Sequence, residues 1–131
     1  MEKWKIIPTV SVNGIAFGES RDVVREIIGH AFQEFKKTPI AKNTTDAYAD
    51  YHVYYDDQNR FEAIEFFGDV KVYVGRCVVF PGKIGKAQKI FADLVDDGYG
   101  YTSQDASVGI TLADDNVTID GILFGCKDYY K

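Results

Sequence analysis

Three kinds of residue in this chain could take part in catalysis: histidines, nucleophilic serines or cysteines, and grouped carboxylates. A histidine works as a general base beside a nucleophile, and neither His30 nor His52 has a partnered nucleophile in the sequence. No serine lies in a Gly-x-Ser-x-Gly elbow, and Cys77 lies in an apolar run without the positive surroundings that activate a thiol. The sequence therefore contains no recognisable catalytic centre, and we expect a protein that is not an enzyme.

The carboxylates are grouped, but not in the order that a metal or a phosphate requires. The acidic runs at Asp56 and Asp114 lack the alternating Asp pattern and final Glu of a calcium loop, and both suit hairpin turns. Glu62 and Glu65 are three positions apart in a β-rich run, which places them on opposite faces of a strand. Residues 82–87 lack the first glycine and the Ser/Thr of a phosphate loop. We therefore predict no cofactor and no metal.

A group of tyrosines and acids is the best candidate for a recognition surface. Tyrosine offers a large contact area at small entropic cost, and carboxylates steer a basic partner toward it. The predicted partner-binding residues are Tyr54, Asp56, Asp57, Glu62, Glu65 and Asp69. Strand alternation places Tyr51 and Tyr55 on one face and Tyr54 on the other, so one of these faces belongs to the core. A tyrosine-rich sheet with a solvated acidic edge explains the same pattern equally well.

Two segments that could position this surface have the periodicity of helices. Residues 20–29 begin with Ser20 as N-cap and carry apolar residues at helical spacing. Gly29 either ends this helix or interrupts a longer one. Residues 84–97 place an apolar face opposite three lysines and end at an Asp-Asp-Gly sequence.

Most of the remaining chain has the composition of β-strands. The expected strands form two hairpins around polar turns and two further strands, at residues 50–55 with 61–67, 107–112 with 117–124, 70–74 and 76–80. Residues 37–46 are the most loop-like stretch. The predicted fold class is α+β, a mainly antiparallel sheet of about six to eight strands with the two helices packed on it.

A weak internal repeat relates these elements. Residues 15–18 and the helix after them resemble residues 78–81 and the second helix at an offset of 63, and the hairpins match at an offset of 58. Duplication explains this match, and so do chance and ordinary α+β patterning. We expect one domain over residues 1–131, with residues 10–68 and 72–125 as candidate strand-helix-hairpin repeats that share one core.

The acid excess belongs to the later part of the chain. The 131 residues carry 20 acids and 15 bases, a formal net charge of −5. Residues 1–45 have a net charge of +2, and residues 46–131 have a net charge of −7. An acidic surface repels phosphates, so we expect no nucleic-acid partner. The same surface suits a basic protein partner.

The sequence contains no recognisable secretion signal and no membrane-spanning segment. The N-terminal segment lacks an apolar run of signal-peptide length, and no stretch approaches the 18 apolar residues of a membrane span. Cys77 and Cys126 lack metal or redox spacing, so we expect two buried thiols in a reducing compartment rather than a disulfide. We therefore expect a cytoplasmic protein without a membrane partner. A homo-oligomer is neither indicated nor excluded.

Residues 14–29, GIAFGESRDVVREIIG, contain a Gly-Ile-x-x-Gly-x-Ser motif, a short helix and a hydrophobic-Gly pair. This pattern resembles uncharacterised bacterial proteins associated with immunity to polymorphic and contact-dependent growth-inhibition toxins. Further motifs that carry the resemblance lie at residues 35–39, 43–46, 53–56 and 62–67. The resemblance covers most of residues 12–70 and is weaker afterwards. A second, weaker resemblance is to tandem-repeat enzyme inhibitors.

The resemblance implies a cytoplasmic protein that binds and blocks a cognate toxin domain, often a nuclease with a basic active-site face. We expect an immunity protein that occludes the active site or surface of such a toxin, with acids of the first hairpin facing basic toxin residues. The motifs are structural, so no site residue is carried over from the family. The alternative is a small enzyme or ligand-binding domain with His52 or Glu62 in a cleft between sheet and helices. A homodimer-forming structural domain is a third option.

Overall fold

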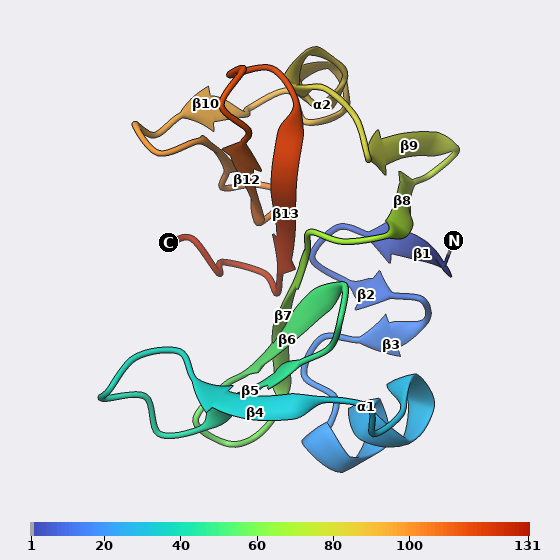
Figure 1. Cartoon of the computed structure of the whole chain (residues 1–131), viewed down its shortest axis with the longest axis vertical. Coiled ribbons are helices and arrows are strands. Elements are labelled where there is room, and N and C mark those ends of the chain that lie inside the picture. Colours follow the sequence, from blue (N-terminus) through green and yellow to red (C-terminus); the bar gives the residue numbers. More distant parts are fainter. Residues whose placement is uncertain (1) are drawn as a thin grey trace.

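The computed structural model describes residues 2–131 and contains thirteen strands and two helices (Figure 1). The helices are α1 (Arg21–Ile28) and α2 (Ile84–Ile90). The strands are β1 (Glu2–Ile7), β2 (Ser11–Val12), β3 (Ile15–Ala16), β4 (Gln33–Lys36), β5 (Thr44–Ala47), β6 (Tyr51–Tyr55), β7 (Phe61–Phe66), β8 (Val70–Val74), β9 (Cys77–Phe80), β10 (Val95–Asp96), β11 (Tyr101–Ser103), β12 (Val108–Leu112) and β13 (Ile119–Gly125).

The strands form two sheets that share one core. The larger sheet has eight antiparallel strands in the order β10-β11-β12-β13-β7-β6-β5-β4. The smaller sheet has the order β3-β2-β1-β8-β9, and within it β1 runs parallel to β8. Trp4 of β1 joins the two sheets, because its ring lies 4.8 Å from that of Tyr51 and 5.3 Å from that of Phe66. The core is therefore built by one sheet facing the other.

The α+β combination of antiparallel sheets and two helices is present, but the expected packing of both helices on one sheet is wrong. The helices lie at opposite ends of the molecule (Figure 1) and bury few side chains, Arg21 and Val24 in α1 and Ala87 in α2. A helix of seven or eight residues is only about 10–12 Å long. Eight strands extend over roughly 34 Å, so a second sheet is needed to cover them.

α1 begins and ends where the sequence predicts. The hydroxyl of Ser20 accepts a hydrogen bond from the amide of Val23 at 3.3 Å, and Gly29 ends the helix with φ 112°. The longer alternative is therefore wrong. The face turned to the protein is not fully apolar, since Arg21 and Val24 are buried while Ile27 is 60% exposed.

α2 is shorter than predicted, since it ends at Ile90 instead of reaching residue 97. Phe91 leaves the helix to enter the core, where its ring lies 6.4 Å from that of Phe124. Asp93 then accepts hydrogen bonds from the hydroxyl of Ser103 and the amide of Asp105, which fixes the following chain as the β10–β11 hairpin.

Both predicted hairpins are present, as β6–β7 and β12–β13, and the two further predicted strands are β8 and β9. β3 lies at the strand position of the first candidate repeat, whereas six short strands lie outside the predicted set, namely β1, β2, β4, β5, β10 and β11. β5 lies partly within the stretch expected to be a loop, and β10 lies within the predicted second helix. All of the six except β1 have four residues or fewer, which is too short for a clear alternating pattern, and β1 escapes prediction although its residues 3–7 alternate between exposed and buried positions.

Equivalent contacts recur in the two halves of the chain. The amide of Arg21 donates to the carbonyl of Asn59 at 2.9 Å, and the amide of Ile84 donates to the carbonyl of Val117 at 2.8 Å. These positions are related by the offsets of 63 and 58 found in the sequence. Both hairpins also have an irregularity at one place, after Tyr54 in β6 and after Thr111 in β12.

The two halves meet at β7 and β13 in the middle of the larger sheet. Phe66 pairs with Ile122, and Ile64 pairs with Phe124, so the register is unchanged when the halves are exchanged. Each half contributes four consecutive strands to this sheet, β4 to β7 and β10 to β13. β1 has no counterpart, because it is inserted between the β2–β3 and β8–β9 hairpins.

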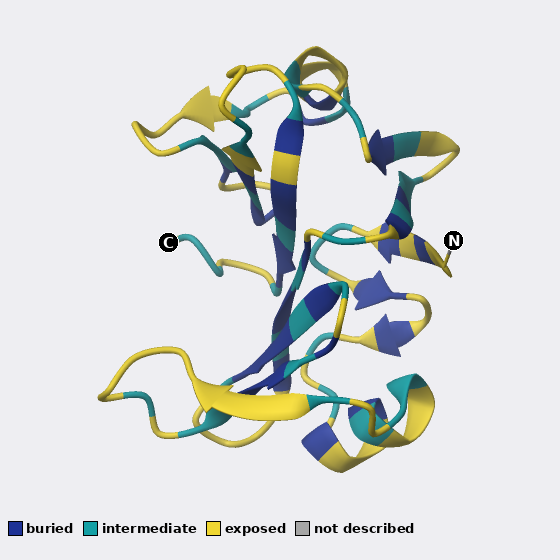
Figure 2. Cartoon of the chain, viewed as in Figure 1, coloured by how far each residue is buried: buried dark blue, intermediate teal, exposed yellow. Residues whose placement is uncertain are grey.

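Residues 126–131, called here the C-terminal strap, return along the larger sheet on the side away from the smaller one (Figure 1). Two glycines make room for it. A Cβ atom on Gly125 would overlap Tyr129, and one on Gly109 would overlap the hydroxyl of Tyr130. β4, at one edge of this sheet, is exposed at every position, whereas β7 and β13 are largely buried (Figure 2).

The cysteines are not buried as expected. Cys77 is exposed at the start of the edge strand β9, and Cys126 is partly exposed at the beginning of the C-terminal strap. Neither helix in residues 2–131 has the length and apolar composition needed to cross a membrane.

Candidate functional site

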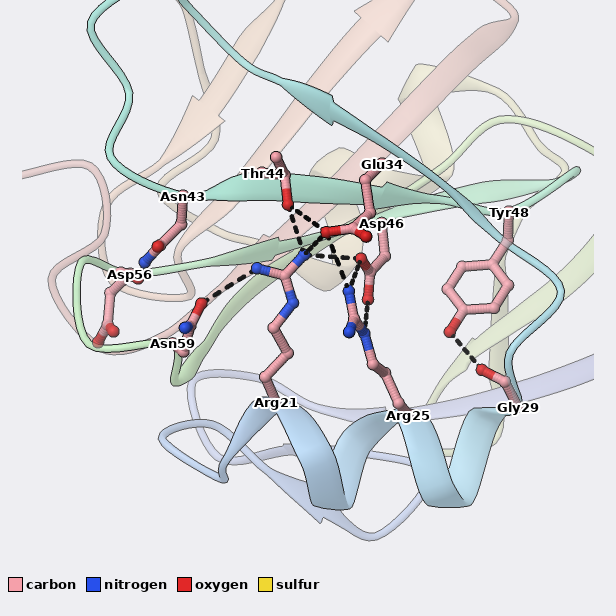
Figure 3. A network of polar contacts seen from close by, with 10 residues as sticks. All are labelled: Arg21, Arg25, Gly29, Glu34, Asn43, Thr44, Asp46, Tyr48, Asp56 and Asn59. Atoms are coloured by element: carbon pink, nitrogen blue, oxygen red, sulfur yellow. Dashed lines mark hydrogen bonds and ion pairs between the residues drawn. The ribbon is translucent and has the colours of Figure 1, made fainter.

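A buried carboxylate organises the end of the molecule that contains α1 (Figure 3). Asp46 has no exposed side-chain surface, and its Oδ1 accepts hydrogen bonds from Arg21 Nη2 at 2.8 Å and Arg25 Nη2 at 2.7 Å. Arg25 Nε donates to Oδ2 at 2.8 Å. Glu34 Oε1 lies 3.4 Å from both guanidinium groups. Two cations and two carboxylates therefore balance each other at the junction of α1, β4 and β5.

The arginines keep Asp46 ionised in this buried position. Burial alone would raise the pKa of Asp46, but the hydrogen bonds from Arg25 and Arg21 outweigh it and hold the pKa below its ordinary value. The bond to Asp46 in turn raises the pKa of the Arg25 guanidinium. A balanced and fully ionised cluster has no group ready to exchange a proton, so this network serves to position other elements.

The elements that it positions include the tip of the first hairpin. Arg21 Nη1 donates to Asn59 Oδ1 at 3.0 Å, and the Arg21 guanidinium lies 4.4 Å from the centre of the Tyr55 ring. The amide of Asn43 donates to the carbonyl of Asp56, which ties the preceding loop to the same tip (Figure 3). The predicted recognition hairpin is thus held rigidly against α1.

A pocket with a volume of about 380 Å³ lies between residues 37–43 and this hairpin. We call it the hairpin pocket. Its lining includes four of the six predicted partner-binding residues, namely Tyr54, Asp56, Asp57 and Glu62. Lys42 and Arg60 also line it. Residues that lie on both strands and the turn of the hairpin are therefore brought to one concave surface.

The two rim acids of the hairpin pocket already have partners. Asp56 Oδ2 lies 3.1 Å from Arg60 Nε, and Asp56 Oδ1 accepts the amides of Gln58 and Arg60 in the turn. Burial raises the pKa of Asp56, but these bonds bring it below the ordinary value. Asp57 Oδ2 lies 3.5 Å from Lys42 Nζ, and both side chains are largely exposed. An exposed ion pair of this kind is worth about 1 kcal/mol or less and is easily exchanged.

Tyr54 and Glu65 lie together on the outer face of the larger sheet. The hydroxyl of Tyr54 donates to Glu65 Oε1 at 3.0 Å, and Tyr54 is only 8% exposed. Burial, with the charge of Glu65 in support, raises the pKa of Tyr54. The predicted role of Tyr54 as an exposed anchor does not fit this position, since the side chain supports the wall of the pocket from within.

The sixth predicted residue, Asp69, is exposed in the connection between β7 and β8. Asp69 does not line the hairpin pocket, and its backbone amide donates a hydrogen bond to Asp50 Oδ1 at 2.9 Å. Asp69 is therefore separated from the other predicted residues.

The histidines lie outside the hairpin pocket. The His52 ring is 5.1 Å from that of Phe35 and 4.8 Å from that of Phe67, on the outer face of the larger sheet. Burial lowers the pKa of His52, and the charge of Glu65 opposes this. His30 is exposed just after α1. Within residues 2–131, no group of three or more His, Cys, Asp or Glu side chains is placed to hold a metal ion.

Sequence reasoning missed Arg21, Arg25 and Lys37 as parts of this region. One signal for the arginines was present: they are four positions apart, on the helical face that also carries Val24. Two like charges on a face turned to the protein indicate a shared buried anion. Nothing in the spacing of residues 21–46 identifies that anion as Asp46.

The chain matches no protein-family model, and neither the curated proteins nor the solved structures contain a significant match to it.

Proposed function

We propose that this chain is a cytoplasmic immunity protein that binds a cognate bacterial toxin domain and blocks it without catalysis. The toxin domain would be basic, as in nuclease-type toxins, and the hairpin pocket with its acidic rim would cover its active site or an adjacent surface. The observation that carries the proposal is the convergence of Asp56, Asp57 and Glu62 on one pocket of a rigidly held hairpin. A preorganised surface loses little entropy when it binds.

The partners of the rim acids support an exchange of ion pairs on binding. Lys42 and Arg60 are exposed and hold Asp57 and Asp56 through surface contacts that contribute little to stability. A basic toxin residue that excludes water from the same carboxylates would interact with them more strongly than the exposed side chain of Lys42 does.

Co-expression with the toxin domain encoded directly upstream tests the proposal, with bacterial growth and toxin binding as the readouts. The wild-type chain should restore growth. A double variant, Asp56→Ala with Asp57→Ala, should bind at least about tenfold more weakly, mainly through faster dissociation. The matched control is Asp114→Ala with Asp115→Ala in the second hairpin, which should retain binding.

Two outcomes would contradict different parts of the proposal. Failure of the wild-type chain to bind the toxin domain and restore growth would refute the immunity function. Full binding by the Asp56→Ala, Asp57→Ala variant would refute the assignment of the site and leave the immunity function in place.

A second candidate is a ligand-binding or enzymatic domain that uses the same pocket. The observation in its favour is that the half-buried carboxylate of Glu62 lines a pocket large enough for a small molecule. His52 lies elsewhere and would take no part. A metabolite that binds the wild-type chain but not a Glu62→Gln variant would favour this function.

We also propose that the two halves, residues 10–68 and 72–125, descend from a duplicated strand-helix-hairpin unit. The repeated amide bonds of Arg21 and Ile84 and the exchange-symmetric pairing of β7 with β13 support this origin. The polar network is confined to the first half, since Ile84 stands at the position equivalent to Arg21. The two copies would therefore have diverged, with the first carrying the recognition surface.

A further inference from the structure

Glu62 differs from the other acids of the hairpin pocket because its carboxylate has no partner. Within residues 2–131 the side chain of Glu62 forms neither a hydrogen bond nor an ion pair. Asp56 and Asp57, in contrast, each form an ion pair. The side chain is half-buried at the start of β7 and lines the hairpin pocket on one side and a second pocket of about 350 Å³ on the other. An ionised carboxylate in such a position lacks the compensation that buried charges normally have.

Three cations, Lys37, Lys42 and Arg60, also line the hairpin pocket; Lys37 is the one whose charge acts on Glu62, and it is held by other contacts. Lys37 Nζ donates to the hydroxyl of Tyr129 at 2.9 Å and lies 4.7 Å from the centre of the Tyr54 ring. Tyr129 belongs to the C-terminal strap, and the strap is seated where Gly125 has no side chain. Lys37 is thus retained by one hydrogen bond and by aromatic faces, which attract cations.

The consequence for Glu62 is an incomplete neutralisation. Burial raises the pKa of its carboxyl, and the charge of Lys37 opposes this only in part, since the pKa stays above its ordinary value. The ionised carboxylate of Glu62 is thus incompletely neutralised within the folded chain, while Lys37 is bound to Tyr129. This arrangement is that of a binding site for a cation from another molecule.

The geometry points to a specific occupant: we propose that the hairpin pocket receives one lysine or arginine side chain of a protein partner, with Glu62 as its counter-ion and Asp57 as the acid at the entrance. The C-terminal strap keeps this receptor free by holding Lys37 against Tyr129. This inference rests on the proposed function, because it names the group of the toxin domain that the pocket recognises.

Side-chain analogues test this directly on the whole chain. N-acetyl-argininamide carries only the guanidinium charge, and N-acetyl-citrullinamide is its neutral isostere. In titrations followed by amide chemical shifts, the first should move the signals of Asn43, Asp57 and Glu62 in a saturable manner, and the second should not. Glu62→Gln should weaken binding of the cation by about tenfold or more, because it removes a charge-assisted contact.

Two further variants separate this receptor from general acidity. Asp120 is exposed at the position equivalent to Glu62 in the second half, so Asp120→Asn should leave the affinity unchanged. Lys37→Gln removes the competing cation and should increase the affinity several-fold, whereas a merely structural lysine would give no change or a loss. Equal binding of the two analogues, or undiminished binding by Glu62→Gln, would overturn the inference.

Failure of this inference and failure of the proposed function are distinguishable. Toxin neutralisation that survives Glu62→Gln, together with unchanged analogue binding, removes the receptor and leaves the immunity function. Analogue binding that depends on Glu62, in a chain that does not restore growth with the toxin domain, removes the immunity function and leaves a cation-side-chain receptor.

Discussion

The guanidinium of Arg25 holds the buried carboxylate of Asp46 at both oxygens, from Nε to Oδ2 over 2.8 Å and from Nη2 to Oδ1 over 2.7 Å. A two-point contact of this kind fixes orientation as well as distance. It joins α1 to β5, and Arg21 extends the connection to the hairpin tip through Asn59. The position of the β6–β7 hairpin therefore depends on one acid whose sequence context is unremarkable.

Replacement of Asp46 should be strongly destabilising. Asp46→Asn leaves two arginines facing a neutral amide in a buried site, and we expect a loss of about 3–5 kcal/mol in the free energy of unfolding, measured by urea denaturation. Glu34→Gln is the control, because Glu34 contacts the same arginines with a half-exposed side chain, and this variant should lose much less stability. Similar losses for the two variants would contradict the central role of Asp46.

Replacement of Glu62 should have the opposite effect at neutral pH. The raised pKa means that the folded chain binds this proton more tightly than the unfolded chain, so stability decreases as the pH rises from 4.5 through the folded value. Glu62→Gln should therefore raise the melting temperature at pH 7, and the gain should vanish below pH 4. Thermal unfolding at both pH values measures this. Asp120→Asn should show no comparable gain, and a loss of stability in Glu62→Gln at pH 7 would contradict the unpaired state of the acid.

The exchange symmetry of the central strand pair should appear in the energetics. Ile64 and Ile122 are both fully buried, and each faces a phenylalanine of the other half. Ile64→Val and Ile122→Val should each reduce the free energy of unfolding by about 1 kcal/mol. Chemical denaturation should give values within a few tenths of a kcal/mol of each other. A difference greater than about 1 kcal/mol would show that the two environments are not equivalent.

A single methyl group added at Gly125 should displace the C-terminal strap. Gly125→Ala would place Cβ against the Cβ and ring of Tyr129, so the strap must shift at a cost of about 1–3 kcal/mol. Faster hydrogen exchange at residues 126–131 would report the release. Gly85→Ala in α2 meets open space and should be neutral or stabilising by up to about 1 kcal/mol. Unchanged exchange of the strap in Gly125→Ala would contradict this packing.

The sequence predicts the elements whose apolar spacing or end signals are clear, and it misses the others, including the six-residue β1. β7 and β13 have enough apolar residues to reveal their periodicity, and Ser20 and Gly29 mark the ends of α1. β5 escapes prediction because Thr44 and Asp46 are polar, and they become strand residues only through their contacts with α1. Residues 91–97 look helical because Phe91 and Leu94 fit the spacing, but Phe91 serves the core from outside the helix.

The candidate site was predictable only along the hairpin. Asp56, Asp57 and Glu62 are close in sequence, so their convergence follows from a single turn. Lys37 and Tyr129 are 92 positions apart, and only the folded chain shows that one holds the other. The difference between a paired acid and an unpaired one is likewise set by tertiary contacts, which composition does not reveal.

The position of β1 determines when the molecule can be completed. Glu2 pairs with Val70, 68 positions later, so β1, which meets β2 nearby in the chain, must wait for β8 before it gains its second partner strand. Until then the core lacks Trp4, the single tryptophan of the chain, which is 2% exposed once folded. Its fluorescence is therefore a built-in signal for the moment at which the two halves close around the N-terminal strand.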